Sequence, residues 1–329
     1  MTRRVDVHAH YFPEPYVEAM TAREEPPKLV WQDGALILDF GPGGTFPLHP
    51  EMTDLEMQVA AMDDAGVDQA ILSIIPPAVD GLEAADARVL AAASNDVLSE
   101  VSKGNHGRFR AVAMLPAVDP DAAAAELQRA VGLGLRGGVL LTNVRGARLD
   151  DERFRPIFEA AADLDVPIVL HPTTPAIPDP FLGFALMTIA GFIMETTVCA
   201  LRLVFTGLYE RHPDFKLLVP HVGASIPYLL GRIEYEAERY GVVADTLSEP
   251  LDDHLRRLYL DSVCAWPPAL KLALDAFGTD RVLLGTDVPF WAREKNVDAL
   301  DDVGLDAADL EKVSAGNADA FFGTTGTAA

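Results

Sequence analysis

Short apolar stretches alternate with longer amphipathic stretches along almost the whole chain. The apolar stretches are rich in Val, Ile and Leu, and their length predicts buried β-strands. They cover residues 4–9, 69–75, 110–115, 138–141, 167–171, 216–221, 257–263 and 281–285. Helical patterns cover residues 53–65, 84–104, 121–134, 152–165, 189–211, 225–240, 267–277 and 306–320. Strands that alternate with helices predict parallel pairing through right-handed crossovers, and eight such units indicate an α/β protein with a (β/α)8 TIM barrel.

Two segments fall outside this repeat. Residues 21–50 contain the turn-like run Phe40-Gly41-Pro42-Gly43-Gly44 and are predicted to form a small flap after the first strand. Residues 172–188 are rich in proline and aromatic side chains and follow the fifth strand. Because the loops after barrel strands surround the active site, both segments are expected on the catalytic face. No long linker divides the chain, so residues 1–329 are expected to form a single domain.

The charge balance limits the partners of this protein. The chain has 26 Lys and Arg against 50 Asp and Glu, which gives a formal net charge of −24. Such a charge repels phosphate backbones and anionic membrane surfaces, so neither nucleic acid nor a membrane is an expected partner. A small carboxylate substrate is compatible with it, because a metal ion and one or two arginines can reverse the potential inside a pocket.

Cysteine usage and the hydrophobic stretches favour a cytoplasmic location. The two cysteines, Cys199 and Cys264, lie in apolar contexts that suit reduced thiols in a protein core. The N-terminus leads directly into the first strand without the apolar region of a signal peptide. The longest apolar stretch, residues 181–204, is interrupted by Glu195 and Arg202, so we expect a buried helix rather than a membrane span.

The first predicted strand carries two histidines separated by one residue. Side chains alternate along a strand, so Asp6, His8 and His10 are expected to share one face. Residues two apart on a strand lie roughly 6.5 Å from each other, close enough for both imidazoles to reach one metal ion. Asp6 is either a group that supports these ligands or a buried partner of the strand ends. A pair of histidines near a terminus can equally be ordinary surface residues.

Other predicted strands also end in ionisable residues. His171 ends the fifth strand, His221 ends the sixth and Asp287 follows the eighth, at the ends where such barrels carry their catalytic groups. Three imidazoles and a carboxylate suit Zn²⁺ and also accept Mn²⁺, Co²⁺ or Fe²⁺. His221 is then the predicted general base, because histidine exchanges protons near neutral pH. The remaining histidines lie in predicted loops or helices and are assigned no chemistry on position alone: His49, His106, His212 and His254.

These residues and several further segments resemble the amidohydrolase superfamily and, within it, the branch of the 2-amino-3-carboxymuconate-6-semialdehyde decarboxylases. The matching segments are residues 6–10, 170–172, 195–197, 207–216, 221–232, 284–290 and 316–318. The resemblance implies a single metal ion held by His8, His10, His171 and Asp287, with His221 as the acid/base residue. It also implies a homodimer in which Arg232 reaches the active site of the neighbouring subunit and binds a substrate carboxylate. The fourth strand has no lysine that could bridge a second metal.

The predicted flap departs from this branch. Its relatives carry an arginine after a phenylalanine that clamps a substrate carboxylate, whereas this chain has Thr45-Phe46-Pro47-Leu48-His49. His49 either replaces part of the clamp or is a solvated loop residue. Together with Phe290 and Trp291, which follow Asp287, it is the candidate substrate contact.

The predicted reaction is non-oxidative decarboxylation of a small unsaturated or aromatic carboxylic acid by a metal-dependent enzyme. The same five residues would also serve a metal-dependent hydrolase or hydratase. A third interpretation is a ligand-binding barrel without catalysis, which the filled ligand and base positions disfavour. No glycine-rich dinucleotide or phosphate motif is present, so no redox cofactor is expected.

Overall fold

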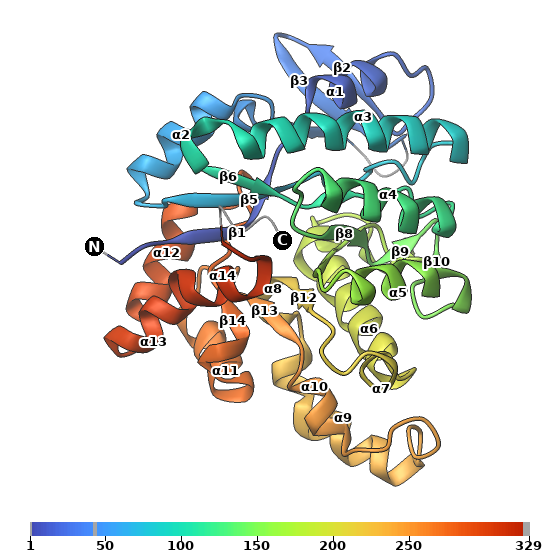
Figure 1. Cartoon of the computed structure of the whole chain (residues 1–329), viewed down its shortest axis with the longest axis vertical. Coiled ribbons are helices and arrows are strands. Elements are labelled where there is room, and N and C mark those ends of the chain that lie inside the picture. Colours follow the sequence, from blue (N-terminus) through green and yellow to red (C-terminus); the bar gives the residue numbers. More distant parts are fainter. Residues whose placement is uncertain (1, 42–44, 325–329) are drawn as a thin grey trace.

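The computed structural model describes residues 2–41 and 45–324 and shows a mixed α/β fold built on parallel strands (Figure 1). One sheet has the order β1-β5-β6 and a second has the order β14-β13-β12-β11-β8-β7, with every pair parallel. The strands are β1 (Val5–His10), β5 (Gln69–Ser73), β6 (Phe109–Ala111), β7 (Ala113–Met114), β8 (Gly138–Leu141), β11 (Ile168–His171), β12 (Leu217–Val219), β13 (Tyr259–Asp261) and β14 (Val282–Leu283). Nearly all of their residues are buried, as expected for parallel strands covered on both faces.

Backbone hydrogen bonds link the two sheets along both edges. The third predicted strand is split into β6 and β7, and Val112 between them donates to the Leu72 carbonyl at 3.1 Å. At the other edge, the Val7 N–H donates to the Leu284 carbonyl at 2.8 Å and the His10 N–H donates to Val288 at 3.2 Å. Pairing with β1 therefore continues into the loop after β14.

Helices follow most strands and cover their outer side. They are α1 (Glu14–Thr21), α2 (Leu55–Asp64), α3 (Ala84–Lys103), α4 (Pro120–Gly132), α5 (Arg155–Asp163), α6 (Phe192–Phe205), α7 (Leu208–Arg211), α8 (Pro220–Gly223), α9 (Ile226–Tyr240), α10 (Leu251–Leu255), α11 (Pro267–Phe277), α12 (Arg293–Asp302), α13 (Ala307–Glu311) and α14 (Asn317–Phe322). Side-chain caps fix several starts: Asp54 accepts from two backbone N–H groups of α2, and Asp119 caps α4 ahead of Pro120.

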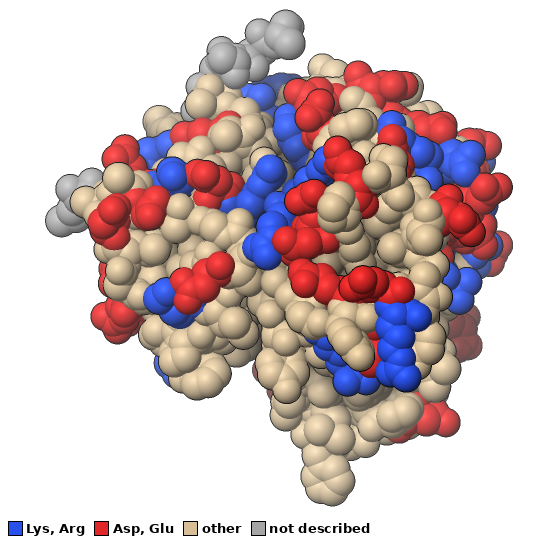
Figure 2. All heavy atoms as spheres, turned by 90° about the horizontal axis from the view of Figure 1, so that it is seen from below, with Lys and Arg blue, Asp and Glu red and all other residues tan. Residues whose placement is uncertain are grey.

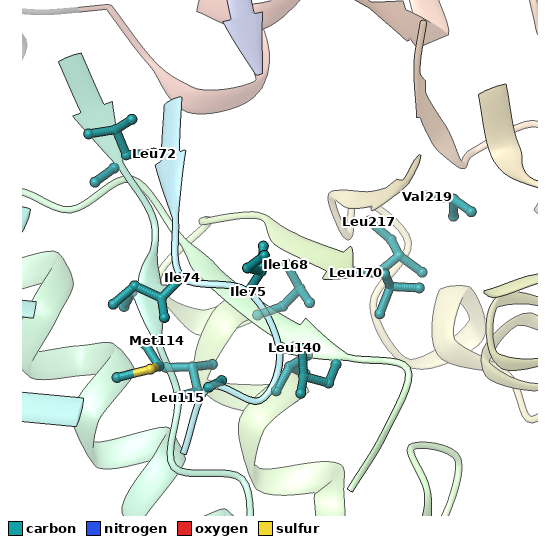
Figure 3. Close-up of a cluster of buried hydrophobic side chains, with 14 of the residues drawn as sticks. Leu72, Ile74, Ile75, Met114, Leu115, Leu140, Ile168, Leu170, Leu217 and Val219 are labelled. Carbon is teal, nitrogen blue, oxygen red and sulfur yellow. The ribbon is translucent and has the colours of Figure 1, made fainter. Parts of the chain in front are cut away.

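Two apolar clusters form the core. The larger one lies between strands and helices, and Figure 3 shows part of it, including Leu72, Met114 and Leu170. The smaller one joins side chains from the strands to the last helix, α14. Its members include Val5, Val7, Ile71, Val112, Val139, Val169, Leu218, Leu283, Phe321 and Phe322. Because the Phe321 ring lies 4.6 Å from that of Tyr259, the first residue of β13, α14 covers the amino ends of the strands.

Several predicted element boundaries are wrong. The sixth strand ends at Val219 and not at His221, which lies in the turn that follows. The helix predicted over 189–211 breaks after Phe205, because Gly207, with a φ of 80°, is the N-cap of a separate helix, α7. The helices α1, α8, α10 and α12 were not predicted. α12 is dominated by charged residues, so its apolar repeat is too weak to be recognised from the sequence.

The segment predicted as a flap forms a small antiparallel sheet. It consists of β2 (Lys28–Gln32), β3 (Ala35–Asp39) and β4 (Thr45–Pro47), in that order. Asp33 and Gly34 connect β2 and β3 with φ values of 51° and 80°, the conformation that a two-residue hairpin requires. Positions 42–44 of the predicted glycine-rich turn lie outside the described residues.

The surface gives two further observations. On the face in Figure 2, acidic and basic side chains are interspersed, and no continuous basic surface is visible there. One helical stretch, Met187–Phe205, is long and apolar enough to cross a membrane by length and composition, and 39% of its most apolar window is buried in the protein. A core helix of a soluble protein passes the same test, so this stretch is weak evidence for a membrane span.

Candidate active site

Three histidines and one aspartate converge where β1, β11 and the loop after β14 meet. One ligand atom from each of His8, His10, His171 and Asp287 lies within 4.8 Å of all the others, and all four residues are buried. The ring of His10 lies 5.0 Å from that of His8 and 5.1 Å from that of His171, centroid to centroid. The structure thus brings together the four residues predicted as metal ligands.

Hydrogen bonds on the outer nitrogens orient the three imidazoles. His8 Nδ1 lies 2.7 Å from Asp261 Oδ2, and His171 Nδ1 lies 2.9 Å from the Pro172 carbonyl. His10 Nδ1 lies 3.1 Å from the Ser73 hydroxyl. Each ring therefore turns its Nε2 toward the centre, as carboxylate- and carbonyl-supported metal ligands do.

The inner nitrogens fit a bound cation. The Nε2 atoms of His8 and His171 are buried and form no hydrogen bond with any described residue, although His8 Nε2 lies 3.3 Å from Asp287 Oδ1. Buried polar atoms without a partner are rare in proteins and need an explanation. Two unsatisfied imidazole nitrogens beside the Asp287 carboxylate are a donor set that a divalent ion such as Zn²⁺ or Mn²⁺ satisfies.

Strand β1 does not alternate regularly. Its register against β5 slips between Asp6 and Ala9. Val7 consequently belongs to the smaller core cluster and Ala9 to the larger one, although a regular strand would place both on one face. His8 and His10 do converge as predicted, but Asp6 does not join them in the group of candidate metal ligands. Asp6 accepts hydrogen bonds from the backbone N–H groups of His8 and Thr286, both at 3.0 Å, and is a buried partner of the strand ends.

His221 joins this group from a strained turn. It has φ 58° and ψ 58°, and Val222 follows with φ 52° and ψ 32°. Left-handed conformations are unusual for residues other than glycine, and most of all for a β-branched one. His221 Nε2 lies 3.3 Å from Asp287 Oδ2, and its ring centroid lies 5.5 Å from that of His8. All five ionisable residues predicted at the strand ends thus share one site.

The charges of the group depend on each other. Burial raises the pKa of Asp287, but the His8 charge and hydrogen bonds from His10 and His221 hold it well below its usual range. Burial lowers the pKa of His8, but Asp287 and Asp261 outweigh it and raise that pKa to about 9. Burial lowers the pKa of His10 to about 4, and burial together with the neighbouring His10 holds the pKa of His171 well below its usual value. Without a metal the site therefore pairs the Asp287 carboxylate with a protonated His8 beside neutral His10 and His171, and a bound metal ion would have to displace the His8 proton.

Two polar residues that organise the site escaped the sequence prediction. Asp261 is the last residue of β13 and is fully buried. Asn296 of α12 accepts from the backbone N–H groups of Cys264 and Ala265, both at 3.0 Å, and donates to the Thr286 carbonyl at 3.1 Å. Asp261 could have been found, because it is an acidic residue near the end of an apolar strand pattern. Asn296 carried no such signal, since its helix was not predicted.

The predicted substrate contacts divide into two groups. Phe290 lies beside the histidines, with its ring 5.8 Å from that of His10 and 5.1 Å from that of Phe46 in β4. Trp291 follows it and is 40% exposed. His49 is half-exposed and caps a short helical turn by accepting from the Glu51 N–H. Arg232 is exposed on α9 and has no hydrogen bond or ion pair with a described residue, the site histidines included.

The fold and the buried His-His-His-Asp group define an α/β protein with a candidate metal centre. The family model described as Amidohydrolase matches residues 5–324, so the chain belongs to the amidohydrolase family. A gamma-resorcylate decarboxylase of Polaromonas sp. (strain JS666 / ATCC BAA-500) is 31% identical over 303 residues, which cover 86% of this chain and 92% of that protein.

Two further comparisons agree with this assignment. The 2-amino-3-carboxymuconate-6-semialdehyde decarboxylase of Dictyostelium discoideum is 30% identical over 72% of this chain and 66% of that protein. A crystal structure of a dihydroxybenzoic acid decarboxylase from Polaromonas sp. JS666, with bound manganese and the inhibitor 2-nitroresorcinol, superposes with a TM-score of 0.81 at 28% identity. The superposition covers 98% of this chain and 97% of the decarboxylase chain.

Proposed function

We propose that this protein is a metal-dependent, non-oxidative decarboxylase of a small unsaturated or aromatic carboxylic acid. The observation that carries the proposal is the buried group of His8, His10, His171 and Asp287 with His221 beside Asp287. The similarity to decarboxylases of aromatic acids over most of the chain supports this reaction over the other chemistry that such a site could perform.

His8, His10, His171 and Asp287 would hold one divalent ion. When bound, the ion supplies positive charge that attracts and polarises substrate oxygens. The donor set favours Zn²⁺ and also accepts Mn²⁺, Co²⁺ or Fe²⁺, and manganese in the related structure makes Mn²⁺ a candidate of equal interest. Elemental analysis of protein purified without chelators identifies the ion.

His221 would move the proton. In decarboxylation the bond between the ring carbon and the carboxylate carbon breaks, its electron pair stays on the ring carbon, and CO2 leaves. A proton must then form the new C–H bond, and His221 can deliver it from a position fixed by its turn. Asp287, 3.3 Å from His221 Nε2, holds the imidazole in orientation.

Aromatic side chains would form the substrate side of the site. Phe290 links the histidines to Phe46 of the small sheet, and Trp291 lies next to it along the chain. Such a wall suits the flat face of an unsaturated or aromatic acid. We assign the substrate carboxylate to Arg232 of a second subunit, with His49 as a further polar contact at the rim.

A homodimer is the proposed assembly. The segment before and within α6 exposes a series of large apolar side chains, and monomeric proteins rarely leave such series open to water. They are Ile177, Leu182, Phe184, Ile189, Met194 and Val198, of which Phe184 is 93% exposed. A second copy that covers this segment would also give the exposed Arg232 a partner surface.

We further infer that the linked sheets form a (β/α)8 barrel in a single domain of residues 1–329. The hydrogen bonds from Val7 to Leu284 and from Val112 to Leu72 support this barrel, since they join the sheets at both edges. Residues 21–50 would then serve as the flap over its mouth. We assign the protein to the cytoplasm on its reduced cysteines and its charge.

The test is a survey of substrates with protein loaded with Zn²⁺ or Mn²⁺. Hydroxybenzoates and unsaturated carboxylates are incubated in D2O, and CO2 release and deuterium in the product are measured. The proposal expects CO2 with one deuterium on the carbon that lost it, and loss of both in His221→Asn. Addition of water without CO2 would identify a hydratase, and hydrolysis products would identify a hydrolase.

A further inference from the structure

The carboxylate of Asp261 touches both halves of the proposed machinery. Its Oδ2 lies 2.7 Å from Nδ1 of the metal-ligand candidate His8. Its Oδ1 accepts hydrogen bonds from the backbone N–H of His221 at 2.7 Å and of Val222 at 3.4 Å. Asp261 is fully buried, and no lysine or arginine of the described residues pairs with it. One carboxylate therefore connects a ligand from the first strand to the turn that carries the acid/base residue.

The turn needs such an acceptor. His221 and Val222 are consecutive left-handed residues, a conformation that costs free energy in residues that carry a Cβ. Their N–H groups point to the same oxygen, and hydrogen bonds from backbone N–H groups to a carboxylate are stronger than those to a neutral acceptor. The bond to Oδ1 thus offsets part of the strain and keeps the His221 ring turned toward Asp287.

Two glycines near Asp261 lie where no side chain would fit. A Cβ atom at Gly285 would lie 2.8 Å from the Asp261 Cβ and 3.2 Å from the His8 Cβ. A Cβ at Gly223, in the same turn as His221, would lie 2.7 Å from Leu260, the residue before Asp261. Two glycines therefore allow β14 and the turn to pack closely against the end of β13.

We propose that Asp261 is a positioning residue that couples metal binding to proton transfer, by orienting His8 with one oxygen and holding the His221 turn with the other. The proposal rests on the function proposed above and extends it, because it makes the ligand and the acid/base residue depend on one group. Residues that support metal ligands in this way typically change metal affinity or activity 10- to 100-fold when replaced.

Asp261→Asn separates the two contacts. An amide has one accepting oxygen and one donating NH2 group, so it cannot serve both partners. If its oxygen keeps the His221 N–H, its NH2 faces His8 Nδ1 and forces the ring proton onto Nε2, where the metal should bind. We therefore expect Asp261→Asn to weaken Mn²⁺ binding about 10- to 100-fold in a chelator competition. At saturating Mn²⁺, kcat should stay reduced while KM changes less.

Asp6→Asn is the matched control. Asp6 is an equally buried carboxylate that accepts from the backbone N–H groups of His8 and Thr286 and from the Thr286 hydroxyl and lies 3.8 Å from Arg293 Nε, but no imidazole nitrogen bonds to it. Its replacement also removes a buried carboxylate charge, and we expect Mn²⁺ affinity close to that of the wild type even where thermal stability falls. Equal losses of affinity in both variants would overturn the proposal, because any buried carboxylate would then have the same effect.

A spectroscopic measurement on the wild type tests the contact between Asp261 and His8 Nδ1 without any variant at Asp261. In zinc-loaded protein labelled with ¹⁵N-histidine, the Nδ1 proton of His8 is expected far downfield and slow to exchange, as for a proton held by a buried carboxylate. Its signal is assigned by its absence in His8→Gln. An ordinary, fast-exchanging proton at His8 would contradict the proposal even if Asp261→Asn did not fold.

The two proposals fail differently. If the wild type releases no CO2 from any tested acid, the proposed function fails, while Mn²⁺ affinity and the His8 proton still decide the role of Asp261. If the wild type is a decarboxylase and Asp261→Asn keeps wild-type Mn²⁺ affinity and kcat, only the role of Asp261 is refuted.

Discussion

Single residues at this site either face its centre or hold those that do. His8, His10 and His171 point Nε2 inward, while Asp261, Ser73 and the Pro172 carbonyl bind their outer nitrogens. His221 differs from the three ligand candidates, because its neighbour is the second oxygen of Asp287. This difference agrees with the proposal that metal binding and proton transfer are carried out by different histidines.

This division predicts opposite results for two substitutions of the same type. His221→Asn should keep bound metal but reduce kcat about 10²- to 10⁴-fold, the usual contribution of an acid/base group. His171→Asn removes an inward nitrogen and should lose the metal itself, as chelator treatment of the wild type should. Metal content per chain and kcat are measured on the same preparations. Loss of metal from His221→Asn would show that the roles are assigned wrongly.

Asp80, in the loop after β5, predicts a pH dependence of stability that is independent of the metal. Burial raises the pKa of Asp80 to about 7, against a weaker opposite effect of Arg145, and none of the described residues forms a hydrogen bond with its Oδ2. An acid whose pKa is raised by folding stabilises the fold at low pH and loses that contribution as pH rises through the folded value. Asp80→Asn should therefore gain stability relative to the wild type between pH 5 and pH 8, by up to about 3 kcal/mol.

Urea denaturation of both proteins at pH 5 and pH 8 measures this difference. The control is Asp63→Asn, because Asp63 is an exposed carboxylate on α2 and should show no such change. If Asp80→Asn and the wild type differ in free energy of unfolding by the same amount at pH 5 and at pH 8, Asp80 does not titrate in this range.

At the scale of elements, α14 closes the end of the strands opposite the site. Phe321 is 2% exposed and packs with Val5, Val7 and Tyr259, while Asp319 of the same helix pairs with Arg3 and Arg110. The helix therefore contributes to stability at the end of the strands opposite the histidines.

Phe321→Ala should lower the free energy of unfolding by about 3–5 kcal/mol, because it leaves a cavity in this smaller core cluster. Val89 on α3 is 72% exposed, so Val89→Ala should change the free energy of unfolding little. Urea denaturation measures the free energy of unfolding of both variants. Under conditions in which the protein is folded, the metal affinity of both variants should match that of the wild type. A reduced metal affinity in Phe321→Ala would mean that α14 supports the site as well as the core.

For the whole molecule, the exposed apolar segment predicts self-association. Light scattering of the wild type should give the mass of two chains. Phe184→Glu places a charge on the most exposed side chain of the segment and should shift the mass toward one chain, whereas Val89→Glu on α3 should not. If Arg232 acts across the dimer, Phe184→Glu should also raise KM for a carboxylate substrate. A wild type that is monomeric at all concentrations would refute both the dimer and this role of Arg232.

Much of the architecture follows from local patterns. The parallel strands and most helices are visible in the sequence, because apolar periodicity and capping residues act within a few positions. The candidate ligands are recognisable for the same reason: His8, His10, His171 and Asp287 stand at or just beyond the ends of apolar strands. Helix α12 was missed because its composition is polar, and Asn296 was missed with it.

What the sequence determined by itself is therefore the order of elements and the residue types of the site, since both depend on neighbours along the chain. Only the tertiary structure decided how those residues are held. The register slip in β1 depends on pairing with β5, and the left-handed turn at His221 depends on a carboxylate from β13. Asp261 and His8 are 253 positions apart, so their contact exists only after the strands have assembled.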